Sequence, residues 1–176
     1  MTRPPFQQPP RADGATAPGG VPAAAIAMGE IGVGRDGDAL RTFLGSCVGL
    51  ALYDRRRKIG GLAHIVLPDS RGQGQPPGKY ADTAVRHTIR LLEALAGGET
   101  LRLVAKLAGG AKMFPFQTGM TVGDQNVQAV ERLLAAEGIA VVGRCCGGEH
   151  GRHMTLEVST GTVWIDTVGS DTRVIL

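Results

Sequence analysis

The chain has 176 residues, of which 43% are hydrophobic and 20% charged, a composition typical of one soluble globular domain. The formal net charge of +3 is too small to indicate a surface that neutralises nucleic-acid phosphates, and the few aromatic residues offer no platform for stacking bases. No apolar stretch approaches the length of a membrane span, and no signal-peptide pattern opens the chain. We therefore expect a cytoplasmic protein that neither binds nucleic acid nor inserts into a membrane.

The first 22 residues hold six of the ten prolines and show almost no apolar periodicity. Such a segment buries too little apolar surface to offset the conformational entropy that it would lose on ordering. We expect residues 1–22 to form a flexible leader and residues 23–176 to form a single folded domain.

Short apolar runs open the predicted domain, at residues 24–33, 39–44, 48–53 and 59–67. Three of the four are too short for helices and are rich in Val, Leu or Ile, which predicts β-strands. Residues 54–58, between the last two runs, contain the basic sequence RRRK. We interpret them as a solvated hairpin turn, with a partner-binding patch as the alternative.

The apolar period changes after a glycine-rich loop at residues 68–78. Apolar residues between positions 79 and 96 recur at three- and four-residue steps, which is typical of an amphipathic helix, and Gly97 and Gly98 supply its end.

A second helix is predicted beyond an irregular stretch at residues 108–123, with Asp124 as its cap and Gly138 at its end. Further strands are predicted at residues 101–107, 139–142, 153–159 and 162–166. The pattern predicts an α+β fold, a single layered domain with a mostly antiparallel or mixed sheet and two main helices.

Cys47 is the first candidate for chemistry, because it follows a predicted strand and the small residues Gly45 and Ser46. Small residues let a substrate carbonyl approach the sulfur while backbone N–H groups bind its oxygen. A free cysteine is also among the residues most often buried as packing. The two interpretations remain open on this stretch alone.

A working cysteine nucleophile needs a base beside it, and histidine is the usual one. His64 lies in the strand that follows the turn after Cys47, so antiparallel pairing can bring its ring near the thiol. Its flanks are apolar, so it is either a buried structural histidine or the base of a Cys-His pair. His87, on the polar side of the first predicted helix, is expected to be solvated.

Cys145, Cys146, His150 and His153 supply ligand types that zinc binds. Adjacent cysteines point to opposite sides of a strand, which favours a structural role for both. Three cysteines, two of them adjacent, make a poor disulfide framework, so we expect free thiols. No phosphate-binding or dinucleotide-binding glycine motif precedes a helix. We expect neither a metal nor an organic cofactor.

Several blocks agree in order and spacing with one family: LGSCVGLALYD at 44–54, GGLAHIVLP at 60–68, KYADTAV at 79–85, AKLAGGAKMF at 105–114, GGEHGR at 147–152 and TGTVWI at 160–165. With these blocks the chain resembles the chemoreceptor glutamine deamidase family, CheD, from about residue 24 to residue 166.

The resemblance implies an enzyme that converts selected glutamines of methyl-accepting chemotaxis receptors to glutamate and ammonia. It implies a Cys-His-Thr triad of Cys47, His64 and Thr42, acting through a thioester without metal or cofactor. Backbone groups around Gly45 and Ser46 are then expected to lie at the substrate's approach and to hold its oxyanion. The family also binds the chemotaxis phosphatase CheC, so a non-catalytic binding module is the alternative. A third possible function is that of a cysteine amidase that acts on another protein or on a small amide.

Overall fold

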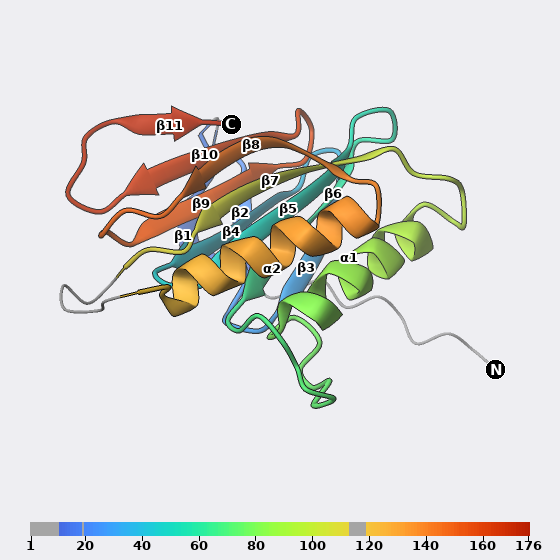
Figure 1. Ribbon diagram of the computed structural model, residues 1–176. Helices are drawn as coiled ribbons and strands as arrows, with labels where there is room; N and C mark the ends of the chain where they lie inside the picture. Colours follow the sequence, from blue (N-terminus) through green and yellow to red (C-terminus); the bar gives the residue numbers. More distant parts are fainter. Residues whose placement is uncertain (1–10, 19, 113–118) are drawn as a thin grey trace.

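The most continuous apolar stretches of the chain form the two central strands of a five-stranded sheet, β5 (Val48–Asp54) and β6 (Ile59–Ile65). Every residue of both strands is buried, as expected where a sheet is covered on both faces. The computed structural model describes residues 11–18, 20–112 and 119–176. Within them the chain forms two sheets and two helices in three layers (Figure 1).

The five-stranded sheet has the order β3-β6-β5-β7-β8 and is antiparallel except between its last two strands. Its remaining strands are β3 (Ile31–Arg35), β7 (Leu103–Gly109) and β8 (Ala140–Cys146). The six-stranded sheet has the order β1-β2-β4-β9-β10-β11, with one parallel pair, β2 with β4. Its strands are β1 (Arg11–Thr16), β2 (Pro22–Ala25), β4 (Ala39–Leu44), β9 (Arg152–Glu157), β10 (Thr162–Thr167) and β11 (Arg173–Ile175).

Alternation along β5 divides its side chains between two apolar layers. Leu50 and Leu52 pack in the layer beneath helices α1 (Ala81–Leu95) and α2 (Val122–Ala136), which cover the outer face of the five-stranded sheet. Ala51 and Tyr53 pack in the layer between the two sheets. Each fully buried leucine contributes about 1.5–3 kcal/mol relative to an exposed one, so this central strand stabilises both layers at once.

The α+β prediction is confirmed, with the single predicted sheet resolved into two that stack face to face. The hairpin turn at residues 54–58 is also confirmed, since β5 and β6 pair antiparallel on either side of it. The first helix ends at Leu95, and Gly97 beyond it takes a positive φ of 73°. This left-handed conformation costs glycine nothing and ends the helix as predicted.

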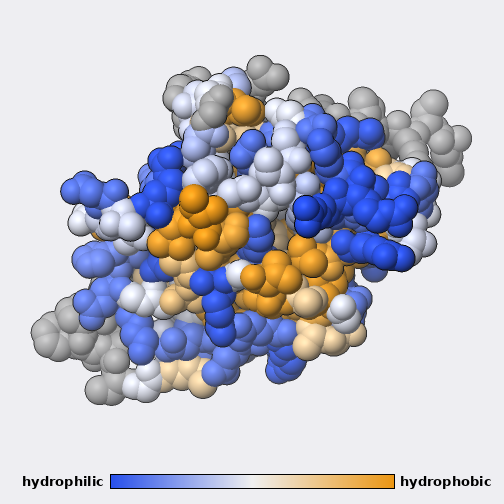
Figure 2. Space-filling model, turned by 90° about the horizontal axis from the view of Figure 1, so that it is seen from above, coloured by the Kyte–Doolittle hydropathy of each residue, from blue (hydrophilic) through white to orange (hydrophobic). Residues whose placement is uncertain are grey.

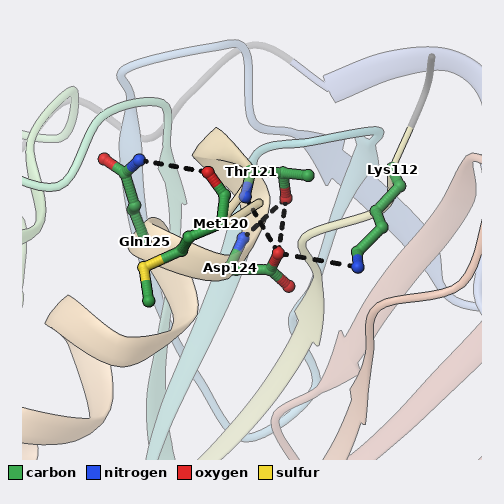
Figure 3. A network of polar contacts seen from close by, with 5 residues as sticks. All are labelled: Lys112, Met120, Thr121, Asp124 and Gln125. Atoms are coloured by element: carbon green, nitrogen blue, oxygen red, sulfur yellow. Dashed lines mark hydrogen bonds and ion pairs between the residues drawn. The ribbon is translucent and has the colours of Figure 1, made fainter. Parts of the chain in front are cut away.

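The second helix begins earlier than predicted, because its cap is Thr121 and not Asp124 (Figure 3). The Thr121 hydroxyl accepts from the Asp124 N–H at 3.2 Å, while the Asp124 carboxylate accepts from the Thr121 N–H at 3.0 Å. This reciprocal capping box makes Asp124 the third helical residue. Lys112 Nζ lies 3.8 Å from the same carboxylate and ties the helix start to the end of β7.

Two strands, β1 and β11, form where none was predicted. β1 lies inside the expected flexible leader, where it pairs antiparallel with β2. Composition misses this pairing because backbone hydrogen bonds between strands leave no mark on residue type. Residues 1–10 of that leader, and residues 113–118 of the irregular stretch 108–123, lie outside the described residues. None of the described helices is long and apolar enough to cross a membrane.

The edge strands β8 and β11 bring the two sheets together along one side of the molecule. A Cβ added to Gly143 of β8 would lie 3.1 Å from the Cβ of Leu176, the residue that follows β11. The view from above shows apolar side chains on this part of the surface (Figure 2). The exposed large apolar residues of the two strands are Val142, Val174 and Ile175.

Candidate active site

The segment Gly45–Cys47 crosses from β4 in one sheet to β5 in the other, so it spans the two layers. Close backbone approach at this crossing requires glycine. Gly109, at the end of β7, has a φ of 101°, and a Cβ added there would collide with the Cys47 carbonyl oxygen. The crossing segment is therefore held directly against the backbone of β7.

Three consecutive carbonyl oxygens of the crossing segment accept hydrogen bonds from other parts of the chain. The donors are the Ala111 N–H to Gly45 (2.9 Å), Asn126 Nδ2 to Ser46 (3.3 Å) and the Gly110 N–H to Cys47 (2.8 Å). The Ser46 and Cys47 N–H groups, by contrast, donate to no carbonyl oxygen of the described residues. The carbonyls of the segment are thus fixed, while the Cys47 N–H interacts with its own sulfur, and backbone donors beside a thiol can bind an oxyanion.

His64 lies on β6 directly opposite Gly49 of β5, and its side chain is only 3% exposed. A Cβ added to Gly49 would contact Leu44 and Met154 of the six-stranded sheet, so this position faces the layer between the sheets. His64 shares that face, and half-buried Cys47, two residues before Gly49, packs against the apolar cluster of the same layer. The thiol and the imidazole thus lie on one side of the five-stranded sheet.

Thr42 reaches His64 from the other sheet. Its Oγ1 lies 2.7 Å from His64 Nδ1 and 2.7 Å from the Ile26 carbonyl oxygen. A hydroxyl has one proton, and the Ile26 carbonyl can only accept, so the Thr42 proton goes to Ile26. The oxygen of Thr42 then accepts from His64 Nδ1–H. This geometry leaves the second ring nitrogen, Nε2, as the unprotonated one in the neutral imidazole.

His64 Nε2 is buried and forms no hydrogen bond with any residue that the structure describes. Burial lowers the pKa of His64, and the Ile26 carbonyl, which favours the charged ring, opposes it more weakly. Burial also raises the pKa of the Cys47 thiol, against a smaller lowering by its own backbone N–H. Both effects favour the neutral forms, a thiol at Cys47 and an imidazole at His64, and the Cys47 thiol forms no hydrogen bond with Nε2 in this structure.

The other candidates lie elsewhere. His87 is on α1, on the opposite face of the five-stranded sheet from His64. Cys145 packs in the layer between the sheets and Cys146 in the layer beneath the helices, so their side chains point to opposite faces, as predicted. The described residues contain no group of three or more His, Cys, Asp or Glu side chains that would hold a metal ion.

Asn126 and Arg152 support the site and were missed at the sequence level. Arg152 donates to the carbonyl oxygens of Cys145 (2.6 Å) and Gly147, and so holds the turn after β8. The same turn holds residues 109–112, because the Gly147 N–H donates to the Gly109 carbonyl and the Lys112 N–H donates to the Gly148 carbonyl, both at 2.8 Å.

For Asn126, the sequence offered one signal, a polar residue at an inward position of an apolar helical stripe.

Comparisons with known proteins agree on one family. A family described as CheD chemotactic sensory transduction matches residues 66–167, a range that begins two residues after His64. A probable chemoreceptor glutamine deamidase CheD of Methanococcus vannielii is 48% identical over 142 residues, covering 80% of this chain and 92% of the relative. The chemoreceptor glutamine deamidase CheD of Thermotoga maritima is 40% identical over 145 residues, covering 82% of this chain and 91% of the relative. The chain therefore belongs to the CheD family.

Proposed function

We propose that this protein is a chemoreceptor glutamine deamidase that acts in the cytoplasm, with Cys47 as nucleophile, His64 as base and Thr42 as the residue that orients the base. Membership of the CheD family and the names of the relatives support the reaction and the substrate. The observation that carries the residue assignment is the 2.7 Å contact between Thr42 Oγ1 and His64 Nδ1, which leaves Nε2 free to accept a proton.

The reaction begins as the Cys47 sulfur attacks the carboxamide carbon of a receptor glutamine while His64 Nε2 takes the thiol proton. The carboxamide oxygen becomes an oxyanion, which the N–H groups of Ser46 and Cys47 bind. The protonated His64 then gives its proton to the amide nitrogen, the carbon–nitrogen bond breaks, and ammonia leaves a thioester on Cys47. Water, deprotonated by His64, hydrolyses that thioester to glutamate and restores the thiol.

Thr42 is a weaker partner for the imidazolium than the carboxylate found in many triads, because a hydroxyl carries no charge. It nevertheless fixes the ring orientation and the tautomer through one buried hydrogen bond. Catalysis by His64 would then depend on the orientation of its ring more than on a charged partner. A modest turnover rate is the expected consequence.

Mass spectrometry of a receptor cytoplasmic fragment incubated with the wild-type protein tests the function. We expect individual glutamines of the fragment to gain the mass of an amide-to-acid conversion, and glutamines of an unrelated helical protein to remain unchanged. No conversion in the fragment would favour the non-catalytic alternative, a binding module for a CheC-type phosphatase. Equal conversion of both proteins would indicate a general amidase.

A nucleophile that competes with water tests the thioester. Hydroxylamine added during turnover should divert part of the product to the glutamyl hydroxamate, because a thioester reacts with amines. A fragment that yields only glutamate at every hydroxylamine concentration would indicate direct attack of water on the amide.

A further inference from the structure

We infer that Asn126 is a positioning residue for the proposed reaction, holding the Cys47 segment in register with the strand that carries His64. The inference rests on the proposed function and adds to the triad a residue from a third element, helix α2. Asn126 is fully buried, although its side chain is polar and helix α2 packs mainly by apolar contacts. A buried amide is costly unless its hydrogen bonds are made, so its partners indicate its purpose.

The amide nitrogen of Asn126 donates to two carbonyl oxygens, Ser46 at 3.3 Å and Val66 at 2.9 Å. Both partners can only accept, which fixes the amide with its nitrogen toward them. Ser46 directly precedes Cys47, and Val66 follows His64 by two residues. One NH2 group therefore bridges the two segments that carry the proposed nucleophile and base.

The bridge matters because the two segments are held differently. His64 lies inside β6, where pairing with β3 and β5 fixes its backbone. Cys47 lies outside the strands, and its segment depends on its three anchored carbonyls. Two of these anchors come from residues 110 and 111 beside β7, while Asn126 is the described anchor that also contacts Val66, directly after the strand of His64.

Helix α2 is itself fixed at the end nearest to Asn126. The Thr121 and Asp124 capping box forms the first turn of the helix, directly before Asn126 (Figure 3). Close packing continues at Gly123, where an added Cβ would lie 2.6 Å from the Gly110 carbonyl oxygen. The start of helix α2 is thus packed closely against the residues that follow β7. The hydrogen bond from Asn126 then fixes the Ser46 carbonyl relative to this helix.

Two substitutions break the bridge: Asn126→Leu removes the donor, and Asn126→Asp keeps the shape but carries at most one proton, so it cannot donate to both carbonyls. Misplacement by about 1 Å can reduce a rate by about 100-fold, so we expect kcat on the receptor fragment to fall by about that factor with KM little changed. Thr88→Val is the matched control. Thr88 is also fully buried, but its hydroxyl donates only within α1, to the Ala84 carbonyl at 2.7 Å. It should lower the melting temperature and leave kcat unchanged.

Alkylation of Cys47 by iodoacetamide, located by peptide mapping, tests the alignment without using the receptor. Each variant is assayed below its own melting temperature. We expect His64→Ala to slow alkylation near neutral pH, Asn126→Leu and Asn126→Asp to slow it by a similar factor, and the His64→Ala, Asn126→Leu double variant to be no slower than His64→Ala alone.

The outcomes separate the two proposals. Wild-type alkylation in both Asn126 variants, or effects of His64 and Asn126 that multiply in the double variant, would overturn the positioning role. An alkylation rate that His64→Ala leaves unchanged would overturn the Cys47–His64 pair itself. Failure of the wild type to deamidate the receptor fragment, with the alkylation pattern as expected, would overturn only the proposed reaction.

Discussion

Cys47 and Cys146 lie near the same end of β7, since Gly109 of β7 pairs with Val48, the residue after Cys47, on one side and with Cys146 on the other. Both side chains are half-buried, and burial is the largest cause of a raised pKa for both thiols. Arg144 and Arg152 lower the pKa of Cys146 in part, so charge alone would favour Cys146 as the more reactive thiol.

The backbone and the facing histidine distinguish the two sites. Cys146 ends a regular strand and packs beneath the helices. Cys47 lies in a crossing segment with three anchored carbonyls, on the face of the sheet where His64 presents an oriented ring. Burial raises the pKa of both thiols, so the two sites differ instead in their backbone anchors and in the buried histidine that lies on the same face as Cys47.

After the loss of the proposed nucleophile itself in Cys47→Ala, the largest effect is expected from His64→Ala. General acid and base catalysis contributes about 10²- to 10⁴-fold, and His64 serves in both roles, so kcat should fall within that range. His153→Ala is the matched control, because burial lowers the pKa of that histidine too, but its ring stacks on Phe43, with ring centroids 4.9 Å apart. Receptor-fragment deamidation measures both. A comparable loss in His153→Ala would show that histidine burial, and not placement, matters.

Thr42→Val should produce the next largest loss. The valine keeps the shape but leaves the buried Nδ1–H of His64 without its acceptor, at a cost of about 1–3 kcal/mol, or about 5- to 150-fold in rate. Thr155→Val is its control in the same sheet, since Thr155 is also fully buried and its hydroxyl has no partner among the described residues. We expect Thr155→Val to retain the wild-type kcat. Equal rates for the two variants would remove Thr42 from the proposed triad.

The pH dependence gives a smaller but more specific test. His64 must be neutral to accept the thiol proton, and burial lowers its pKa below the ordinary value of about 6.5. The raised pKa of Cys47 keeps the thiol protonated beyond its ordinary value of about 8.5. As the pH increases, kcat/KM should therefore rise over an acid limb that lies below about pH 6.5, and then stay level through neutral pH. An acid limb above that value would contradict a buried, neutral base.

Thr121→Ala is expected to have the smallest effect. Loss of the capping box should reduce the free energy of unfolding by about 0.5–2 kcal/mol, because the Asp124 N–H loses its acceptor. Thermal or urea denaturation measures this loss, with Thr160→Ala, an exposed turn threonine outside the helices, as the control. If unfolding is unchanged, the capping box does not stabilise α2.

Much of the fold followed from periodicity. The hairpin of β5 and β6, helix α1 and the turn at residues 160–161 lie where local patterns are strong. The division into two stacked sheets did not follow, because apolar alternation shows which residues are buried and not which partner covers them. β1 was hidden for a related reason, since backbone pairing leaves no apolar period in a segment rich in proline.

The site was predictable only in part. Cys47 and His64 were candidates from their local sequence, Thr42 came from the family resemblance, and the roles of all three remain predictions. The contacts that orient them were not predictable, because the Ile26 carbonyl and Asn126 reach the site from distant parts of the chain. A main-chain acceptor such as Ile26 has no sequence signature at all. Asn126 carried a weak one, a polar side chain at an inward position of α2.

The most direct test of the account compares Cys47→Ala with Cys146→Ala in the deamidation of a receptor cytoplasmic fragment, followed by mass spectrometry. Both variants remove one half-buried thiol near the same end of β7. We expect no detectable conversion of receptor glutamines by Cys47→Ala and a near wild-type rate for Cys146→Ala. Retained conversion by Cys47→Ala, or its loss in Cys146→Ala with the fold intact, would contradict it.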